Sequence, residues 1–279
     1  MSNDNLSAVL YGVNDIRIEQ REIPTPKANQ LLIKFLDTKL RAPFVGWGSA
    51  VKGFSVGDRV ALEPGIPCRG CEQCRGIILV DDACYKIGMW GSARYTEFGH
   101  VRKSYKIRLP DNISYEEGAL MEPLSVAVHA CRRANLQVAQ RVLVEGAGPI
   151  GTLCMMVAKA AGASEVMITD VDSKRLELSK KLGADHVVCV KGMSPSDVRS
   201  AVVDHLECEP DVTIECTGAQ SCMETAIRTT RSGGVVVLVG VGARRAELPI
   251  IETILREVDI KGVLRYANWS ICYEIKVGD

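Results

Sequence analysis

Two stretches of this 279-residue chain contain residue types whose spacing is suited to chemistry. The first is the glycine sequence Gly146-Ala147-Gly148-Pro149-Ile150-Gly151, which directly follows the β-rich run Arg141–Glu145. A helical apolar pattern comes next, and then a second β-branched run, Val166–Thr169, which ends on Asp170. Strand, glycine turn, helix, strand and acid in this order are typical of a site that binds a dinucleotide.

Each residue of this pattern has a physical role in such a site. Gly146 permits the tight turn, Gly148 lets a pyrophosphate approach the backbone, and Gly151 lets the helix pack close to the strand. The N-terminus of that helix then directs its dipole at the phosphates. Asp170 suits the ribose hydroxyls of NAD and repels the additional phosphate of NADP, whereas Arg175 can accommodate that phosphate. We therefore predict a site for NAD and keep NADP as the alternative, because glycines that only turn the chain would leave the acid unexplained.

The second stretch is a cluster of cysteines in the Gly/Pro-rich loop 64–88. Cys68, Cys71 and Cys74 form a CxxCxxC sequence, and Cys84 follows ten residues later. Thiolates this close in sequence can converge on one Zn²⁺, and four of them complete a tetrahedral structural site. Asp82 is the alternative fourth ligand, and a disulfide is the weaker alternative in a cytosolic chain. We predict a structural zinc that stiffens the loop and performs no chemistry.

The bulk composition limits the class of partner. Lysine plus arginine and aspartate plus glutamate both total 34, so the charges balance, and no long basic or acidic block occurs. This pattern predicts neither nucleic acid nor a membrane surface as partner. No apolar run approaches the roughly 20 residues that cross a bilayer. The polar N-terminus lacks the features of a secretion signal, which predicts a cytoplasmic protein.

From residue 141 onward, apolar β-branched runs alternate regularly with helical patterns. Such alternation predicts an α/β fold with a doubly wound parallel sheet of the Rossmann type. The predicted strands are 141–145, 166–169, 186–190, 211–216, 234–240 and 259–265, and the predicted helices are 149–161, 173–182, 195–206 and 219–230.

The first part of the chain has a different character. Short β runs between residues 6 and 36, broken by prolines, predict a small β domain. Residues 37–54 show no sustained period. The segment 116–135 begins with acids and ends with arginines, as a helix dipole favours, and Pro123 is expected to interrupt this helix beside Glu122.

Several phrases together carry a family resemblance. They are GDRVALEPG (57–65), LPDNISYEEGALMEPLSVAVHACRR (109–133), VLVEGAGPIG (142–151), TIECTG (213–218), TRSGG (230–234) and REVDIKGVLRYAN (256–268). With them the chain resembles the sorbitol (polyol) dehydrogenase branch of the zinc-containing medium-chain dehydrogenases. The resemblance implies a GroES-like β domain over 1–115, and a linking helix with a Rossmann NAD-binding domain over 116–279. It also implies reversible, zinc-assisted oxidation of a small-molecule polyol to a ketose, and association into a homo-oligomer.

The resemblance also implies roles for individual residues. Glu122 matches the active-site glutamate beside the catalytic zinc or its water, and Arg265 and Tyr266 match residues that line the polyol site. The cysteine cluster matches the structural-zinc lobe of many family members. The positions that match those holding NAD are Ile150, Asp170, Arg175, Val239, Gly240 and Val241.

The chain also departs from the family pattern. The phrases GxCGSD and GHE, which carry the family's catalytic-zinc ligands, do not occur, and residues 1–67 contain no cysteine or histidine. A catalytic zinc needs three protein ligands, so this shell cannot be rebuilt locally. After Phe35 the sequence lacks a block of the family pattern, and the sequence after Tyr266 is much shorter than the family's. Three interpretations therefore stay open: a polyol dehydrogenase, an NAD(H)-binding paralogue without catalysis, and a truncated isoform.

Overall fold

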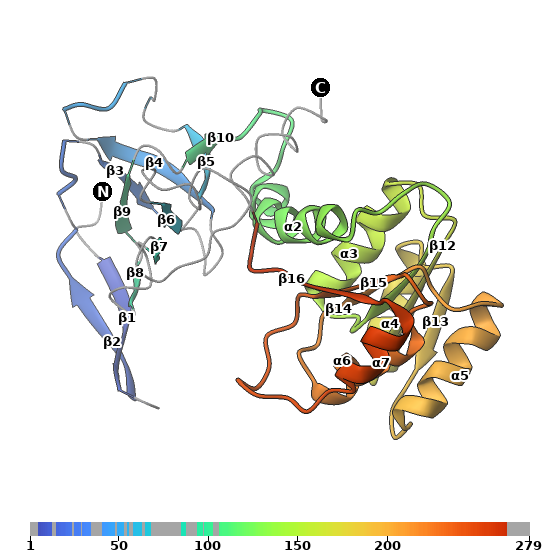
Figure 1. Ribbon diagram of the computed structural model, residues 1–279. Coiled ribbons are helices and arrows are strands. Elements are labelled where there is room, and N and C mark those ends of the chain that lie inside the picture. Colours follow the sequence, from blue (N-terminus) through green and yellow to red (C-terminus); the bar gives the residue numbers. More distant parts are fainter. Residues whose placement is uncertain are drawn as a thin grey trace. The chain divides into compact units, whose positions relative to one another are not determined.

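The chain divides into two compact units, Met1–Glu122 and Pro123–Asp279. A computed structural model provides the coordinates, shown in Figure 1. The structure describes residues 5–12, 15–23, 25–28, 30–34, 41–47, 49–52, 55, 58–62, 65–67, 85–87, 94–96, 98–102 and 106–266.

The first unit is built from short antiparallel strands. They form a three-stranded sheet in the order β2-β1-β8, a five-stranded sheet in the order β10-β5-β4-β3-β9, and the pair β6-β7. The strands are β1 (Asn5–Gly12), β2 (Asp15–Arg21), β3 (Gln30–Lys34), β4 (Arg41–Trp47), β5 (Arg59–Leu62), β6 (Gly65–Pro67), β7 (Tyr85–Ile87), β8 (Arg94–Thr96), β9 (Phe98–Arg102) and β10 (Lys106–Arg108).

Strand β4 lies in the stretch for which the sequence predicted no element. It pairs with β3 on one side and β5 on the other, so tertiary pairing specifies this strand. The register between β3 and β4 shifts between Leu32 and Ile33, and β4 contains Pro43 and Gly46. Such interruptions hide the two-residue period by which a strand is recognised.

The second unit contains a six-stranded parallel sheet, as the sequence predicted. Its order is β13-β12-β11-β14-β15-β16, which is the doubly wound order that reverses between β11 and β14. The predicted fold class is therefore confirmed. The strands are β11 (Arg141–Glu145), β12 (Glu165–Asp170), β13 (His186–Cys189), β14 (Val212–Glu215), β15 (Val235–Leu238) and β16 (Asp259–Gly262).

Helices cover both faces of this sheet. The side chains of each strand alternate between the two faces, so each strand packs against both layers of helices. Val142 and Val144 belong to one buried cluster with residues of α2, α3 and α4, whereas Leu143 packs with Val202 and other residues of α5. The helices are α2 (Tyr115–Ala134), α3 (Pro149–Ala160), α4 (Ser173–Lys181), α5 (Pro195–Leu206), α6 (Gln220–Thr229) and α7 (Ile250–Arg256). The sequence prediction contained the first five of these and missed α7.

Helix α2 runs through Pro123 without a break, so the predicted interruption is wrong. A proline inside a helix costs about 3 kcal/mol, because it lacks an N–H and crowds the preceding turn. Downstream, the helix buries Ala127, Ala130 and Cys131 in the main core, and this packing offsets the cost. At its start, the Ser114 hydroxyl accepts from the N–H of Glu117, whose carboxylate accepts from the N–H of Ser114. This reciprocal cap fixes where the helix begins.

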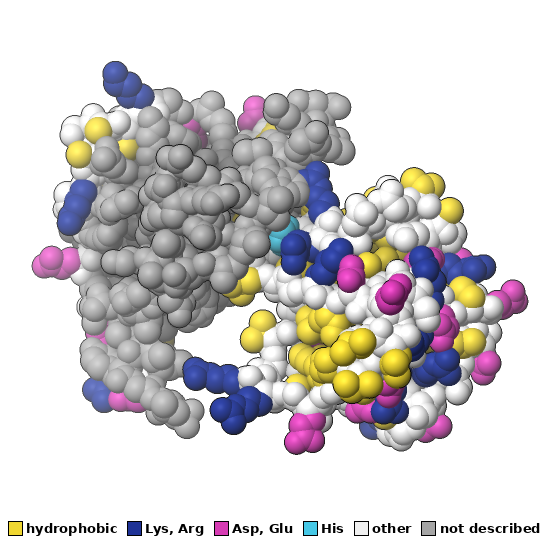
Figure 2. All heavy atoms as spheres, in the orientation of Figure 1, with side chains coloured by type: hydrophobic (Ala, Val, Ile, Leu, Met, Phe, Trp, Pro, Cys, Tyr) yellow, Lys and Arg dark blue, Asp and Glu magenta, His cyan; other side chains and the backbone are white. Residues whose placement is uncertain are grey.

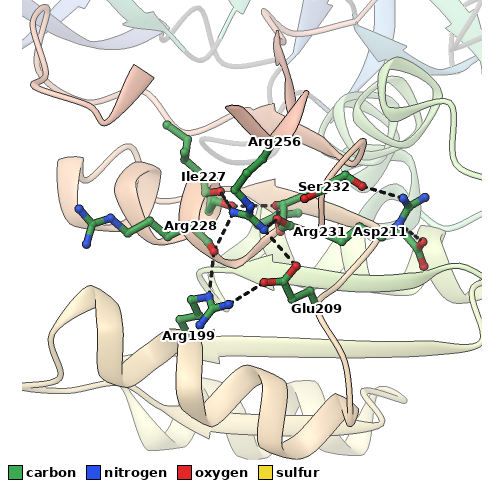
Figure 3. Close-up of polar contacts among 11 residues, drawn as sticks. Arg199, Glu209, Asp211, Ile227, Arg228, Arg231, Ser232 and Arg256 are labelled. Carbon is green, nitrogen blue, oxygen red and sulfur yellow. Dashed lines mark hydrogen bonds and ion pairs between the residues drawn. The ribbon is translucent and has the colours of Figure 1, made fainter. Parts of the chain in front are cut away.

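An arginine ties the end of α6 to the rest of the second unit (Figure 3). Arg256 donates to the carbonyl oxygens of Ile227, Arg228 and Thr230, and its Nη2 lies 3.0 Å from a carboxylate oxygen of Glu209. Glu209 also pairs with Arg199 at 2.7 Å. The guanidinium thus satisfies carbonyl groups that a helix C-terminus leaves without partners in the helix.

Candidate dinucleotide site

The turn between β11 and α3 requires glycine at two places. Gly146 has φ +97°, a conformation that favours glycine, and a Cβ there would lie 2.8 Å from Cγ2 of Thr217. A Cβ on Gly151 would lie 1.8 Å from the carbonyl oxygen of Gly146, which is far inside a van der Waals contact. The chain can therefore turn from strand into helix this closely only with these two glycines.

Gly148 differs, because its surroundings are open. It is the N-cap of α3 with φ −71°, and no described atom lies within 4 Å of where its Cβ would be. No side chain caps this helix, so the first N–H groups of α3 have no side-chain acceptor at the N-cap. An open cradle beside uncapped N–H groups fits a diphosphate, since both the donors and the dipole favour an anion there.

Asp170, at the end of β12, reaches into this turn. Its Oδ2 accepts from the backbone N–H of Ala147 at 2.7 Å, and its Oδ1 accepts from the N–H of Asp172 at 2.8 Å. Arg175 lies 3.9 Å from Oδ2 of Asp170 and is largely exposed. The side chain of Asp172 caps α4 by accepting from the N–H groups of Lys174 and Arg175. The acid predicted to bind ribose is therefore held beside the glycine turn before any ligand arrives.

The predicted residues after β15 join the same region. A Cβ on Gly240 would lie 2.0 Å from the backbone nitrogen of Gly218, in the loop after β14. Val239 and Gly240 both donate their N–H to the carbonyl oxygen of Glu215. The side chain of Val241 is exposed, and that of Ile150 is half-buried against the core. The loops after β11, β14 and β15 thus meet at the carboxyl edge of the sheet, where doubly wound folds bind ligands.

Two glutamates that the sequence prediction did not single out lie beneath these loops. Glu145 ends β11, Glu215 ends β14, and the two residues are in register. Their exposed fractions are 2% and 0%. Burial, and secondarily the carboxylate of Glu215, raise the pKa of Glu145 well above its ordinary value. An acid at the end of each of two apolar strands was the signal in the sequence, but only the register shows that they are neighbours.

The predicted catalytic and substrate residues lie on elements of different units. Glu122 is half-buried on α2, at the end of the first unit. In the second unit, Arg265 has φ +56° and its guanidinium carbon lies 5.6 Å from the centre of the Tyr266 ring. Tyr266 is buried, and its hydroxyl has no hydrogen-bond partner among the described residues. The roles of these three residues stay predictions.

The predicted structural zinc ligands Cys68, Cys71, Cys74 and Cys84 lie outside the described residues. Within the described ranges, no group of three or more His, Cys, Asp and Glu side chains is placed to hold a metal ion. Over the same ranges, no helix combines the length and the apolar character needed to cross a membrane.

Comparison with known proteins agrees with this geometry. The family profile described as zinc-binding dehydrogenase matches residues 149–275. Sorbitol dehydrogenase of Macaca fascicularis is 38% identical over 304 residues, covering 96% of this chain and 84% of its own. Sorbitol dehydrogenase of Mus musculus is 39% identical over 306 residues, covering 95% of this chain and 83% of its own.

Solved structures show the same fold. The 2R,3R-butanediol dehydrogenase of Bacillus subtilis has a TM-score of 0.83 at 25% identity, covering 98% of this chain and 88% of its own. An Escherichia coli oxidoreductase of unknown specificity has a TM-score of 0.86 at 27% identity over the same shares.

The parallel sheet, the glycine turn and the acid at its carboxyl edge define the class of Rossmann-fold dehydrogenases. The identities above, over more than four fifths of each relative, then specify the family. This chain belongs to the sorbitol dehydrogenase family of zinc-binding dehydrogenases. Because 96% of 279 residues is about 268, about 36 of the 304 positions aligned with the macaque enzyme lie opposite no residue of this chain.

Proposed function

We propose that this chain is an NAD-dependent polyol dehydrogenase that oxidises a secondary alcohol of a sorbitol- or xylitol-like substrate to the ketose. The observation that supports this most is the assembly of the glycine turn, Asp170 and the loop 239–241 into one region. The names of the relatives supply the substrate class, since sorbitol is the polyol that they name.

The residues of the second unit would hold the dinucleotide in a fixed orientation. Gly148 and the N-terminus of α3 receive the pyrophosphate, and Asp170 accepts hydrogen bonds from the ribose hydroxyls. Val239, Gly240 and Val241 would line the opposite side of the bound dinucleotide. When bound, NAD⁺ supplies a nicotinamide ring that accepts a hydride from the substrate carbon.

The remaining roles come from the family resemblance. Arg265 and Tyr266 would hydrogen-bond hydroxyl groups of the polyol, and Glu122 would be the active-site glutamate. Cys68, Cys71, Cys74 and Cys84 would hold a structural zinc. The described residues supply no three-ligand shell for a catalytic zinc, so the dinucleotide region and the relatives support this proposal. We also propose that the protein works in the cytoplasm.

The test is NADH formation by the purified, zinc-replete chain with sorbitol and xylitol as substrates. Turnover that depends on the polyol, and that falls at least about tenfold in Glu122→Gln, supports the proposal, because catalytic acids and bases contribute at least that factor. A folded sample that binds NADH but turns over neither polyol would overturn the enzymatic part and leave a dinucleotide-binding paralogue.

We further propose that two copies of the chain associate through α7 and β16. Strand β16 is the edge of the six-stranded sheet, with β15 as its partner among the described strands. On α7, Ile254 and Leu255 are 66% and 79% exposed, and hydrophobic side chains gather over this helix (Figure 2). In a two-fold symmetric dimer the same surface of each copy contacts its equivalent. An exposed apolar helix and an edge strand can therefore both be covered by the same elements of a second copy.

Sedimentation analysis tests this association. Leu255→Glu should shift the chain towards monomers, whereas Leu178→Glu, at an exposed position on α4, should not. A monomeric parent chain at micromolar concentration would contradict the proposal.

A further inference from the structure

Glu145 and Glu215 form a buried acidic pair beneath the loops of the candidate site. They are aligned partners on the neighbouring parallel strands β11 and β14. Aligned residues on adjacent parallel strands lie about 5 Å apart and direct their side chains to the same face of the sheet. Both side chains are essentially inaccessible to solvent. The two carboxyl groups therefore share one small, water-excluded space.

The hydrogen bonds of the pair are unequal. Oε1 of Glu215 accepts from the backbone N–H of Thr217 at 2.6 Å, from that of Gly218 at 2.9 Å, and from the Thr217 hydroxyl. The Oε2 atoms of Glu145 and Glu215 have no hydrogen-bond partner among the described residues. A buried, ionised carboxyl oxygen without a donor is costly, and one proton on the pair removes one of the two buried charges.

No described cation compensates the charge of this pair. The described ion pairs include neither Glu145 nor Glu215, and a titratable side chain that interacts electrostatically with both is Cys222. Burial raises the pKa of Cys222 and the two glutamates add to this effect, so it supplies no positive charge. Two buried carboxyl groups this close cannot both be ionised without a large electrostatic penalty.

We infer that Glu145 and Glu215 share a single proton at neutral pH, and that this proton holds the loops of the dinucleotide site in their binding arrangement. The inference rests on the proposed function only for the identity of the ligand. Glu215 is the acceptor that shapes the turn at Thr217 and Gly218, and Glu145 carries the proton. Both are positioning residues, because they act through the loops.

The link to the dinucleotide runs through close backbone contacts. The methyl group of Thr217 lies 2.8 Å from where a Cβ on Gly146 would be, and the backbone nitrogen of Gly218 lies 2.0 Å from where a Cβ on Gly240 would be. A movement of the turn at 217–218 must therefore displace the glycine turn and the loop after β15. Loss of the shared proton leaves two anions side by side, and their repulsion would drive such a movement.

Stability as a function of pH tests the shared proton without any ligand. Glu145 has a raised pKa in the folded chain, so its stabilising effect is complete below the unfolded value of 4.5 and is lost as the pH rises through the folded pKa. The unfolding constant of the wild type should therefore rise about tenfold per pH unit relative to Glu145→Gln between about pH 5 and the folded pKa. Cys222→Ser should keep the wild-type dependence.

NADH affinity supplies the second readout. Wild-type affinity should fall on the alkaline side, by about tenfold per pH unit once the proton is lost, while Glu145→Gln stays flat. Equal pH dependence of stability in wild type and Glu145→Gln would overturn the shared proton, whether or not NADH binds. Absence of NADH binding at pH 7, with the stability difference intact, would overturn the proposed function and the loop coupling but keep the shared proton.

A spectroscopic measurement covers the case in which Glu145→Gln does not fold. The infrared carbonyl band of a protonated carboxyl group should be present in the wild type at pH 7 and should change in Glu215→Gln. Absence of that band in the wild type contradicts the inference.

Discussion

The Oδ2 atom of Asp170 lies 2.7 Å from the backbone nitrogen of Ala147, so a carboxylate from the end of β12 lies inside the turn between β11 and α3. The other oxygen accepts from the N–H of Asp172, and the residue is only 8% exposed. Both oxygens are therefore oriented by the backbone. An acid held in this way loses little further freedom when a ribose binds, which favours affinity.

Replacement of Asp170 by asparagine tests whether this acid binds the ribose and disfavours NADPH. The amide keeps the shape but removes the charge and one acceptor, so we expect NADH affinity to fall about 10- to 100-fold, as for the loss of a charged hydrogen bond. The preference for NADH over NADPH should narrow as well, because the repulsion of the extra phosphate is lost. Isothermal titration measures both effects. Asp172→Ser, which keeps a helix-capping oxygen, should alter neither value by more than about threefold.

Alanine substitutions at two glycines of the turn distinguish an effect on NADH binding from an effect on folding. Gly148→Ala places a methyl group in open space at φ −71°, so the free energy of unfolding should change by less than about 0.5 kcal/mol while NADH affinity falls. Gly151→Ala forces a methyl group against the carbonyl oxygen of Gly146 and should destabilise the chain by about 1–3 kcal/mol. Urea unfolding and titration of the same samples distinguish the two. Unchanged NADH binding in Gly148→Ala would show that the cradle does not hold the pyrophosphate.

Asp185 gives a pH dependence of stability in the opposite direction to that of Glu145. Burial alone would raise its pKa, but hydrogen bonds from Lys159 and from the N–H of Val166 outweigh burial and lower the pKa below 3.8. Its stabilising effect is therefore present above pH 3.8 and is lost as the pH falls through the lowered value. Asp185→Asn should cost about 1–3 kcal/mol at pH 7.

Urea unfolding between pH 7 and pH 3 measures this effect. The difference between wild type and Asp185→Asn should shrink towards zero in acid. Asp204→Asn, at an exposed position on α5, is the matched control and should show no difference at either end. A penalty for Asp185→Asn that persists unchanged at pH 3 would assign it to packing instead of charge.

The cysteine cluster predicts a metal content. Purified wild-type chain should carry about one structural zinc, and Cys71→Ser should lose it, because removal of one thiolate opens a tetrahedral shell. Elemental analysis of dialysed samples measures this. Cys189→Ser, at an exposed cysteine on β13, should leave the zinc content unchanged. Full zinc in Cys71→Ser would exclude this thiolate as a ligand.

The parallel sheet could be predicted because its strands are continuous apolar runs between turn residues. The predicted strand 141–145 coincides with β11, and the predicted helix 195–206 coincides with α5. Helix α7 was missed because Ile251, Ile254 and Leu255 are exposed, so its apolar residues do not mark a buried face. A search for an amphipathic pattern recognises a helix by its buried apolar face, so it cannot recognise a helix whose apolar side chains are exposed.

Those residues of the candidate site that belong to one local motif could be predicted from the sequence. Those that become neighbours only through the pairing of strands could not. Gly146, Gly151 and Asp170 follow from spacing along a single strand-turn-helix-strand unit. Glu145 and Glu215 are 70 positions apart, and only the pairing of β11 with β14 makes them neighbours. Pro123 was misjudged for a related reason, because the packing that offsets its cost comes from residues distant in sequence.

Binding of NADH and NADPH to the purified full chain tests the central claim most directly. Isothermal titration at pH 7 should give saturable binding of NADH that is at least about tenfold tighter than that of NADPH, as the oriented carboxylate of Asp170 requires. No binding of either dinucleotide to a sample that unfolds cooperatively, or a preference for NADPH, would contradict the assignment of the turn 146–151 and Asp170 as an NAD site.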